Sequence, residues 1–587
     1  MTTPSTAYED DQKVEAKIDH HEYDQKAEAK TDLHDSEESG HGDLAHVPRS
    51  KRTVGQRIKE FGQSLKSKDA WFGDYDYGAL FIPNIPGLFK KRELPFYGPN
   101  DKLPYLLVII LGLQHSLAMV GGLVVPPLLL GGVTGANLPT EVQQYLISAS
   151  LIWCSVGTVI QIQRTRLFGT RYYIGTGIVS VTGTSFAFAN VALKYLQQSY
   201  ENGTCMTLED GTKLPCEAEF GAILGTTIVT GPFAIALAFV PPRIIRRLFP
   251  PLICGLMLTL IGGVLITSGV TNWAGGAGPC RNNHDIMCVA GDRAYKWGSA
   301  QFLGLGLSCF VVIIICEVFG SAFMKSAAVF LGLIAGLAIA AGTGYFNKKV
   351  IKEAPGGTFL FVHRFPLAIR AQLILPMFAA WCIIIVECIG NITASCDVSG
   401  LEIEGERFMS RIQGGILSDS ITATIAGLVT VPALTTFAQN AGVIALTRNA
   451  SRSSGYACAF FLLLMGIIGK FGAIFVAAPP AVIGGFTTFL FGAVTTSGLR
   501  VMAYAKWTRR DRFVVTVSAA LGFSSLCVHD WFSYIFTYQG SNTGLKGLIQ
   551  AVTLIVQEPY LIAAVLGVFL NLVLPSEDEN EGADNTH

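Results

Sequence analysis

The sequence predicts an all-α polytopic membrane protein with about 14 transmembrane segments, on three observations. Half of the 587 residues are hydrophobic and 15% are charged, whereas soluble globular chains carry about 25% charged residues. Apolar runs follow one another from Leu103 almost to the C-terminus. The many glycines and prolines lie inside these runs, as is common in membrane helices. The chain therefore has too little charge to cover a water-facing surface of its size.

Both ends of the chain are polar. Residues 1–70 are rich in charge and histidine and cannot bury a core, so we expect a disordered cytoplasmic tail. This tail lacks the apolar stretch of a cleaved signal peptide, and its histidines fit a solvated tail better than a metal site. Residues 71–102 form a cytoplasmic pre-membrane segment, and residues 575–587 form an acidic cytoplasmic tail.

Successive apolar runs mark the spans, because a helix needs about 20 apolar residues to cross a hydrocarbon core of about 30 Å. The predicted spans, each placed to within several residues, are 103–125, 146–163, 173–193, 220–240, 252–271, 301–319, 325–345, 372–393, 413–430, 439–448, 456–477, 482–500, 513–528 and 552–574.

Two of these spans are too short or too polar to be unbroken helices, namely 173–193 and the run 433–448 that contains the tenth span. They are the third span of the first seven and the third of the second seven. Corresponding interruptions in two halves indicate a transporter built from two repeats. Because each repeat has seven spans, an odd number, the two halves have opposite topology. The sequence thus predicts inverted repeats.

Charged loops predict the orientation. Basic loops at Arg164–Arg171, Arg243–Arg247, Arg448–Arg452 and Lys506–Arg512 fall on one side of the span count, together with both termini. That side is the cytoplasm by the positive-inside rule. The loop 346–371 is also basic but falls outside, so the rule holds by majority.

Two loops on the opposite side carry paired cysteines, Cys205 with Cys216 and Cys280 with Cys288, and the first also holds a sequon at Asn202. Disulfides and a glycan on an oxidising outer face fit this pattern. Four free thiols and an unused sequon fit it equally well, so both interpretations stay open here.

Composition also argues against several partners and reactions. The net charge is zero, whereas binding to nucleic acid needs a basic excess. No nucleophile–base set, phosphate-binding loop or metal-ligand spacing stands out, so we expect neither an enzyme nor a metal site. The partners that remain are membrane lipid and a small solute.

Ionisable residues inside apolar spans are costly, and each is a site hypothesis. The sequence has five, at His115, Glu317, Glu387, Asp419 and Lys470. The Glu387 carboxylate lies in mid-span and must find donors or stay protonated. Such a group can take up a proton on one side and release it on the other, and it can accept the N–H groups of a heterocycle. We favour a functional role for it over a structural one.

The other four residues are less specific. A lone histidine such as His115 is more often a satisfied core residue than a ligand. Asp419 opens an apolar span, where it either interacts with backbone amides at a helix start or takes part in a proton path. Glu317 and Lys470 lie near predicted span ends, where snorkelling to the interface explains them.

The stretch from Thr435 to Arg448 carries the most specific signal. Gln439 and Asn440 present donors and acceptors at the start of a short helix with free backbone N–H groups. This arrangement suits a planar ligand with mixed donor and acceptor edges. Gly442 allows close helix approach. In the corresponding broken span, Ser185 offers a hydroxyl and Phe186 offers a ring that could stack on a heterocycle, although ordinary core packing also accounts for a phenylalanine.

These residues resemble the nucleobase–ascorbate transporter family, specifically its fungal uric acid–xanthine permeases. The family signature is Gln/Glu/Pro-Asn-x-Gly-x-x-x-x-Thr-Arg/Lys/Gly, and it is complete here as Gln439, Asn440, Gly442, Thr447 and Arg448. The glutamine is that of the nucleobase branch. Further matches are Gln114–His115 in the first span, Ser185–Phe186 in the third, Glu387 in the eighth, Asp419 in the ninth, Phe532 in a late span, and Asp74–Gly78 before the first span, which resembles a sorting element.

The resemblance implies a core domain of residues 103–240 and 372–478, and a gate domain of residues 241–345 and 479–574. It also implies a homodimer, elevator-like movement, and symport of xanthine or uric acid with a proton at the plasma membrane. No cofactor is implied other than the co-transported proton.

The resemblance also assigns roles to the site residues. Gln439 and Glu387 hold the purine edge, and Asn440 shapes the helix start. Ser185 and Phe186 contribute from the opposing half-helix. The resemblance assigns Asp419, His115 and Gln114 to a network that tunes proton movement. It assigns Phe532 to a gate that sets specificity.

One departure and two alternatives remain. Where the family often has a second acidic residue, four positions after Glu387, this chain has Asn391, which leaves the proton stoichiometry and substrate range open. The alternatives are a transporter of the same fold for other nucleobases, such as uracil, adenine or hypoxanthine, and one for inorganic anions. An anion transporter is expected to lack the amide pair and to place basic residues at the half-helix starts.

Overall fold

The computed structural model describes residues 65–83, 94–209, 211–241, 244, 250–283, 285–503, 505, 507–528, 535 and 543–575. The chain separates into two units, residues 1–67 and residues 68–587. Nearly all of the predicted N-terminal tail and most of the acidic C-terminal tail lie outside the described residues. The architecture below is that of the second unit.

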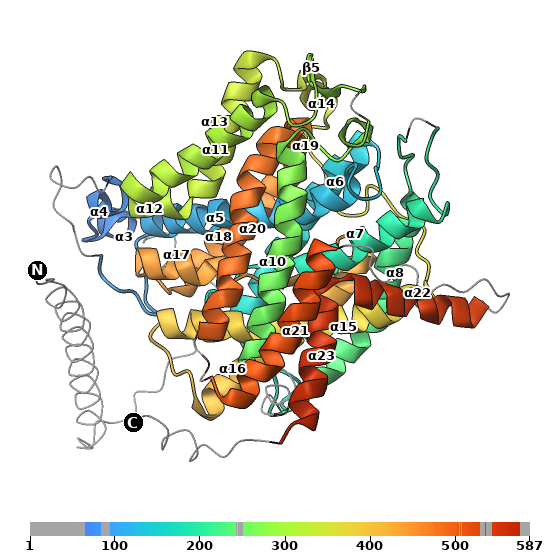
Figure 1. Ribbon diagram of the computed structural model, residues 1–587. Helices are drawn as coiled ribbons and strands as arrows, with labels where there is room; N and C mark the ends of the chain where they lie inside the picture. Colours follow the sequence, from blue (N-terminus) through green and yellow to red (C-terminus); the bar gives the residue numbers. More distant parts are fainter. Residues whose placement is uncertain are drawn as a thin grey trace, which may run out of the picture. The chain divides into compact units, whose positions relative to one another are not determined.

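Helices dominate this unit (Figure 1). In chain order they are α3 (Lys68–Phe72), α4 (Tyr77–Phe81), α5 (Tyr105–Gly131), α6 (Thr140–Ile162), α7 (Phe186–Glu201), α8 (Glu217–Leu237), α10 (Pro251–Trp273), the 3-10 helix η1 (Pro279–Arg281), α11 (Ala300–Phe319), α12 (Ala322–Ser326), α13 (Ala328–Thr343), α14 (Lys348–Glu353), α15 (Ala371–Val398), α16 (Gly405–Leu428), α17 (Gln439–Thr447), α18 (Arg452–Ile467), α19 (Gly469–Ala477), α20 (Pro480–Ala503), α21 (Arg509–Cys527), α22 (Thr543–Gln557) and α23 (Pro559–Val573).

The strands are short and form three antiparallel pairs. They are β1 (Thr165–Arg166) with β2 (Tyr173–Ile174), β3 (Thr182–Thr184) with β6 (Leu434–Thr436), and β4 (Cys288–Ala290) with β5 (Arg293–Tyr295).

Several helices have the length and apolar composition to cross a membrane. Among the described residues there are seven, or up to nine if each of two bent helix pairs counts as one span. The seven are α5, α6, α8, α10, α11, α15 and α20. The other predicted spans correspond to the shorter helix α13, to the more polar helices α16 and α21, and to the two interrupted segments. The number and composition of these helices establish a multi-pass membrane protein.

The two predicted interruptions are present. The segment before α7 is extended and includes β3, and the segment before α17 is extended and includes β6. These two strands pair antiparallel, with Thr182 opposite Thr436 and Thr184 opposite Leu434. All six strand residues are buried. The two extended segments thus pair their backbone groups with each other, as burial in a membrane protein requires.

Two further breaks contradict the predicted unbroken spans 456–477 and 552–574. Helices α18 and α19 are bent by 73° at Ile468, and the pair α22 and α23 is bent by 95° at Glu558. Pro559 explains the second break, because proline has no N–H and drives the preceding residue out of helical geometry. At the first break, the Thr358 N–H donates to the Ile467 carbonyl at 2.9 Å. A loop residue thus satisfies a carbonyl group at the end of α18 that has no partner within the helix.

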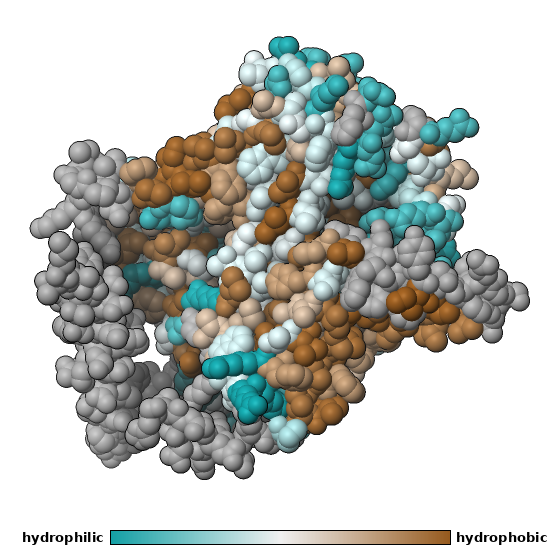
Figure 2. All heavy atoms as spheres, viewed as in Figure 1, coloured by the Kyte–Doolittle hydropathy of each residue, from teal (hydrophilic) through white to brown (hydrophobic). Residues whose placement is uncertain are grey.

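The helices pack in two groups. In one group α10 packs along α20, α11 along α13, and α21 along α23; α10 and α20 run side by side in Figure 1. In the other group α18 packs on α5 and α6, and α16 packs on α8 and α15. Brown apolar surface covers α11 and α23 in Figure 2. Large apolar side chains of α11 are exposed, among them Leu307, Ile314 and Val318, as expected of a helix that faces lipid.

Both cysteine pairs are disulfides, Cys205–Cys216 and Cys280–Cys288. The question that the sequence left open is thus answered in favour of disulfides. The first bridge closes a loop next to the start of α8, and the second holds the loop between α10 and α11, where Cys288 begins β4.

The basic loop 346–371, the exception to the charge rule, lies next to acidic residues at the start of α8. Arg370 forms a two-point ion pair with Glu219, with Nη2 2.5 Å from Oε1 and Nε 3.0 Å from Oε2. His363 Nε2 lies 3.6 Å from Glu217 Oε2. Part of the positive charge of this loop is therefore balanced locally by the two glutamates.

The pre-membrane segment packs against the transmembrane unit. Tyr75, from the Asp74–Gly78 motif, is 8% exposed and packs with Leu80, Leu94 and Leu107. Burial, reinforced by neighbouring tyrosines, raises its pKa to about 12. The segment is also held by its backbone, because the Tyr97 N–H donates to the Arg448 carbonyl at 2.9 Å. It is thus an integral part of the fold.

Candidate functional site

Two short helices begin at the paired strands and define the centre of the site. Helix α7 begins at Phe186 directly after β3, and the Ser185 hydroxyl accepts from the Phe188 N–H at 3.5 Å. Helix α17 begins at Gln439, and no side chain caps it. The first N–H groups of an uncapped helix have no intrahelical acceptor and carry a partial positive charge. The start of α17 therefore offers donors to a ligand.

Gln439 and Glu387 are the two polar side chains available to a ligand here. Both are partly exposed although they lie within the transmembrane unit. Neither makes a hydrogen bond to any other described residue. Helix α15, which carries Glu387, packs against α17, which begins with Gln439. The two residues predicted to hold the substrate thus come from packed helices, with their polar groups unengaged.

Asn440 has a structural position. Its side chain is fully buried, and Nδ2 donates to the Val179 carbonyl at 2.6 Å. This bond ties the start of α17 to the chain that leads into β3. His115 lies close to the Asn440 side chain, but both His115 nitrogens and Asn440 Oδ1 lack a partner with hydrogen-bond geometry among the described residues. His115, on α5, therefore lies next to Asn440, the residue predicted to shape the start of α17.

Ser185 and Phe186 occupy the opposing half-helix. Ser185 is fully buried, and its N–H donates to the Ala433 carbonyl at 2.8 Å. The Phe186 ring stacks on Phe437, with centroids 6.2 Å apart and an interplanar angle of 12°, and it meets Phe491 edge-on. The two faces of the site thus share an aromatic pair, one ring from each broken span.

Thr436 is the centre of a buried network that the sequence did not indicate. Its N–H and its hydroxyl both donate to Asp419 Oδ2, at 2.8 and 2.7 Å. Its hydroxyl also accepts from Gln161 Nε2 at 3.1 Å, and its carbonyl accepts from Asn391 Nδ2 at 2.5 Å. Four elements, α6, α15, α16 and β6, therefore meet at one threonine.

The network corrects the predicted place of Asp419. Helix α16 begins at Gly405, so Asp419 lies in the middle of the helix and the helix-start interpretation is wrong. Its carboxylate still accepts a backbone amide, but from Thr436 across the site. Asn391, which stands where the resemblance leads us to expect a second acidic residue, donates to the same residue. A carboxylate there would instead face the Thr436 carbonyl oxygen and would need a proton to bond it.

Gln114 points away from this network. Its amide donates to the Ala322 carbonyl at 3.2 Å and to the Ser326 hydroxyl, both on α12. The neighbouring Gln114 and His115 side chains thus contact different elements, and only His115 approaches α17.

Three further expectations have clear outcomes. The packing role predicted for Gly442 is wrong, because a Cβ atom at this position would meet nothing within 4 Å. Glu317 and Lys470 are exposed near helix ends, as snorkelling requires. Phe532, the predicted gate residue, lies outside the described residues.

Comparison with known proteins assigns the family. The model described as "Permease family" matches residues 107–530. The chain is 47% identical over 538 residues to "Purine permease" of Emericella nidulans, covering 91% of this chain and 93% of that protein. It is 44% identical over 551 residues to "Uric acid-xanthine permease" of the same organism, covering 93% and 96%.

Among solved structures, the chain matches the transmembrane domain of a cyanobacterium bicarbonate transporter, BicA, with 14% identity, a TM-score of 0.48, and coverage of 80% of this chain and 99% of that one. With the complete signature from Gln439 to Arg448 and the family match over most of its length, the chain belongs to the permease family of nucleobase–ascorbate transporters, whose members are transporters rather than enzymes.

Proposed function

We propose that the chain is a purine transporter that imports xanthine and uric acid together with a proton across the plasma membrane. The observation that carries the proposal is the pairing of two unengaged polar side chains, Gln439 and Glu387, beside the uncapped start of α17. An amide presents one donor and one acceptor, and a carboxylate accepts N–H groups. Together with the free N–H groups of the helix start, these groups complement the alternating donors and acceptors on the edge of an oxopurine.

The proton role is proposed for Glu387. Its carboxylate lies in a transmembrane helix without a basic partner among the described residues, so its charged form is poorly compensated when the site closes. Binding of a proton would remove that cost. Asp419, which already accepts two hydrogen bonds from Thr436, is better suited to holding the site together.

Movement as a rigid element is proposed for the half-helices. Because β3 and β6 pair through their backbones, α7 and α17 form one unit with the helices around them. The other helix group, which includes α10, α11, α13, α20, α21 and α23, would then serve as the gate against which this unit moves. The same proposal includes 14 spans in two inverted repeats, cytoplasmic termini and a homodimer.

The names of the relatives support purines as the substrate class. The alternatives remain other nucleobases and inorganic anions. Gln439 speaks against an inorganic anion, because a transporter of such anions is expected to place basic residues, and not an amide pair, at the half-helix starts.

Uptake of labelled xanthine should be measured in a host that lacks its own purine permeases. We expect saturable uptake that an inward proton gradient increases and a protonophore abolishes. Competition with uric acid, hypoxanthine, adenine, uracil and bicarbonate separates the alternatives. Competition by bicarbonate but not by uric acid would contradict the proposal.

A further inference from the structure

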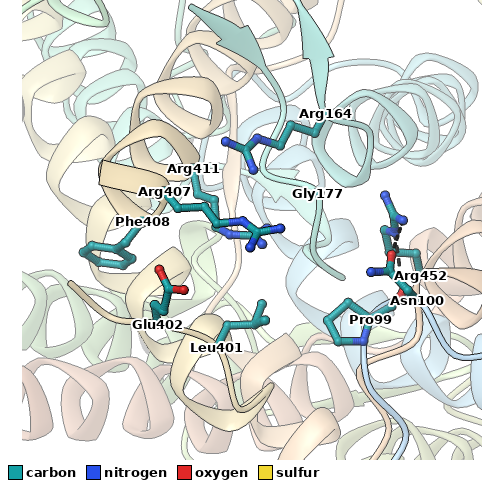
Figure 3. A pocket seen from close by; sticks show the side chains of 10 residues that line it. All are labelled: Pro99, Asn100, Arg164, Gly177, Leu401, Glu402, Arg407, Phe408, Arg411 and Arg452. Carbon is teal, nitrogen blue, oxygen red and sulfur yellow. Dashed lines mark hydrogen bonds between the residues drawn. The ribbon is translucent and has the colours of Figure 1, made fainter. Parts of the chain in front are cut away.

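A pocket of about 290 Å³ lies away from the candidate transport site, at a junction of four segments (Figure 3). The segments are the chain before α5, the connection from α6 to β3, the connection from α15 to α16 together with the first two turns of α16, and the start of α18. The residues that line it are Pro99, Asn100, Arg164, Gly177, Leu401, Glu402, Arg407, Phe408, Arg411 and Arg452. The span count puts all four segments on the cytoplasmic side.

Arginines dominate the lining. Four guanidinium groups face the pocket, from Arg164, Arg407, Arg411 and Arg452, and Glu402 is the only carboxylate among the lining residues. In Figure 3 the Arg407 and Arg411 side chains reach into the centre, and Arg164 approaches from the opposite wall. None of the four arginines forms an ion pair within the described part of the chain.

Three of these arginines are held in place by neutral partners. Arg411 is 9% exposed, and its Nη1 donates to the Thr176 carbonyl at 2.9 Å. Arg164 Nη2 donates to the Ser410 hydroxyl at 2.8 Å, and its Nε is buried without a partner among the described residues. Arg452 is bound to Asn100. Each of these three guanidinium groups is therefore positioned without an ion-pair partner among the described residues.

The positive charges repel one another. Arg164 and Arg407 both lie close enough to Arg411 to oppose its charge, and Glu402 offsets them only in part. Like charges held together in a partly buried site cost free energy. A bound anion would remove that cost, and a polyanion would do so most completely.

The chemistry of the pocket indicates phosphate. Guanidinium groups bind phosphate oxygens through paired, charge-assisted hydrogen bonds. The volume is near the lower end of small-molecule pockets, which span about 300–1,000 Å³. A neutral purine offers no charge to match four arginines, so this pocket differs in kind from the site at Gln439.

We propose that this arginine pocket binds a compact ligand that carries two or more phosphate groups, supplied either by the headgroup of a polyphosphorylated lipid or by a soluble phosphate compound. The proposal stands apart from the transported substrate and is tested without transport.

The pocket also has a route to the transport site. The Thr176 N–H and hydroxyl both donate to the Gln161 carbonyl, at 2.8 and 2.9 Å, and Gln161 Nε2 donates to Thr436. On α16, Asp419 follows Arg411 by two turns, about 12 Å along the axis. A ligand on Arg411 thus sits at one end of a continuous set of hydrogen bonds that ends at Asp419.

Binding should be measured on the purified full-length protein with two probes. One is inorganic tripolyphosphate added to protein in detergent. The other is phosphatidylinositol bisphosphate in lipid nanodiscs, compared with discs that carry the same charge as phosphatidylserine. Arg407→Gln tests the pocket, because the Arg407 side chain is exposed and its loss leaves the buried contacts intact. Arg509→Gln is the matched control, since Arg509 is also exposed and lies at the start of α21.

We expect the wild type and Arg509→Gln to bind alike, and Arg407→Gln to bind about tenfold more weakly, as the loss of one charge-assisted hydrogen bond implies. If both probes bind, the phosphate groups alone are sufficient for recognition by the pocket. Binding of the lipid without tripolyphosphate identifies a lipid headgroup, and the reverse identifies a soluble ligand. Equal affinity for the phosphoinositide and phosphatidylserine discs with no binding of tripolyphosphate would overturn the proposal, as would equal weakening in both variants.

Discussion

Asp419 and Thr436 are joined by two hydrogen bonds to a single carboxylate oxygen, from the Thr436 N–H at 2.8 Å and from its hydroxyl at 2.7 Å. The contact connects the middle of α16 to the strand that precedes α17. Since Thr436 also pairs with Thr182 across the two strands, the Asp419 carboxylate supports both broken spans.

We expect Thr436→Val to lower thermal stability and uptake. Removal of the hydroxyl leaves Asp419 with the Thr436 N–H as its donor and leaves Gln161 Nε2 with the Gly415 carbonyl at 3.4 Å. Each of the two lost hydrogen bonds should cost about 0.5–1.5 kcal/mol. Thr436→Ser keeps both hydroxyl bonds and is the matched control. Melting temperature in detergent and initial uptake rate measure the two effects. Equal behaviour of the two variants would show that the hydroxyl contributes nothing.

Gln439→Ala should abolish uptake or weaken it by about tenfold or more, while the protein still reaches the cell surface. The amide makes no hydrogen bond to another described residue, so its loss breaks no polar contact of the fold but removes a donor and an acceptor from the ligand. Gln197→Ala, which removes an exposed glutamine on α7, is the control. Uptake kinetics should be measured together with the amount of protein at the cell surface. If Gln439→Ala retained the wild-type KM and maximal rate, the assignment of Gln439 to substrate binding would be wrong.

Glu387→Gln should abolish pH-driven accumulation. The amide keeps the shape and one acceptor of the carboxylate but cannot exchange a proton. Glu317→Gln is the control, because Glu317 is a carboxylate in an apolar helix that is exposed near the helix end. Accumulation ratios at several external pH values give the readout. Should Glu387→Gln still concentrate xanthine against a gradient, the proton role passes to Asp419.

The cysteine pattern can be counted directly. The chain has 13 cysteines, of which Cys205, Cys216, Cys280 and Cys288 are in disulfides and the other nine are not. Labelling of the denatured protein with a maleimide should therefore add nine groups before reduction and 13 after it, as measured by mass spectrometry. Thirteen groups before reduction would contradict both bridges.

Phe532→Ala should broaden the set of transported purines with little change in the affinity for xanthine. Polar contacts at Gln439 would determine which purines bind, and the Phe532 ring would determine which purines can pass the gate. Growth and uptake on adenine and hypoxanthine test the gain, with surface protein as the control. If Phe532 is only an interfacial anchor, the variant loses surface protein and gains no substrate.

The sequence was sufficient to locate both broken spans, because polar residues such as Thr184 and Gln439 interrupt apolar runs at matching places. It also identified Glu387 as a carboxylate in the middle of an apolar span and favoured a functional role for it. These are local properties, readable from residue type and position along a span.

Tertiary properties were not readable in this way. A threonine such as Thr436 is ordinary in a strand, and its role depends on Asp419, Gln161 and Asn391, which other elements supply. The apolar run through Ile468 gives no sign of a bend, since hydropathy reports burial and not direction. Gly442 was assigned to packing by residue type, but whether a glycine faces a neighbour or open space depends on the fold around it.

The buried ring of Tyr75 changes how the Asp74–Gly78 motif should be tested. A receptor that reads a sorting signal needs an accessible peptide, but this tyrosine is part of the packed unit, and its segment is held to the chain after α17 by the Tyr97 backbone. Loss of the ring would expose the leucines around it. Protein quality control would then retain the variant as a misfolded protein. Its loss from the cell surface would not show that the motif is a sorting signal.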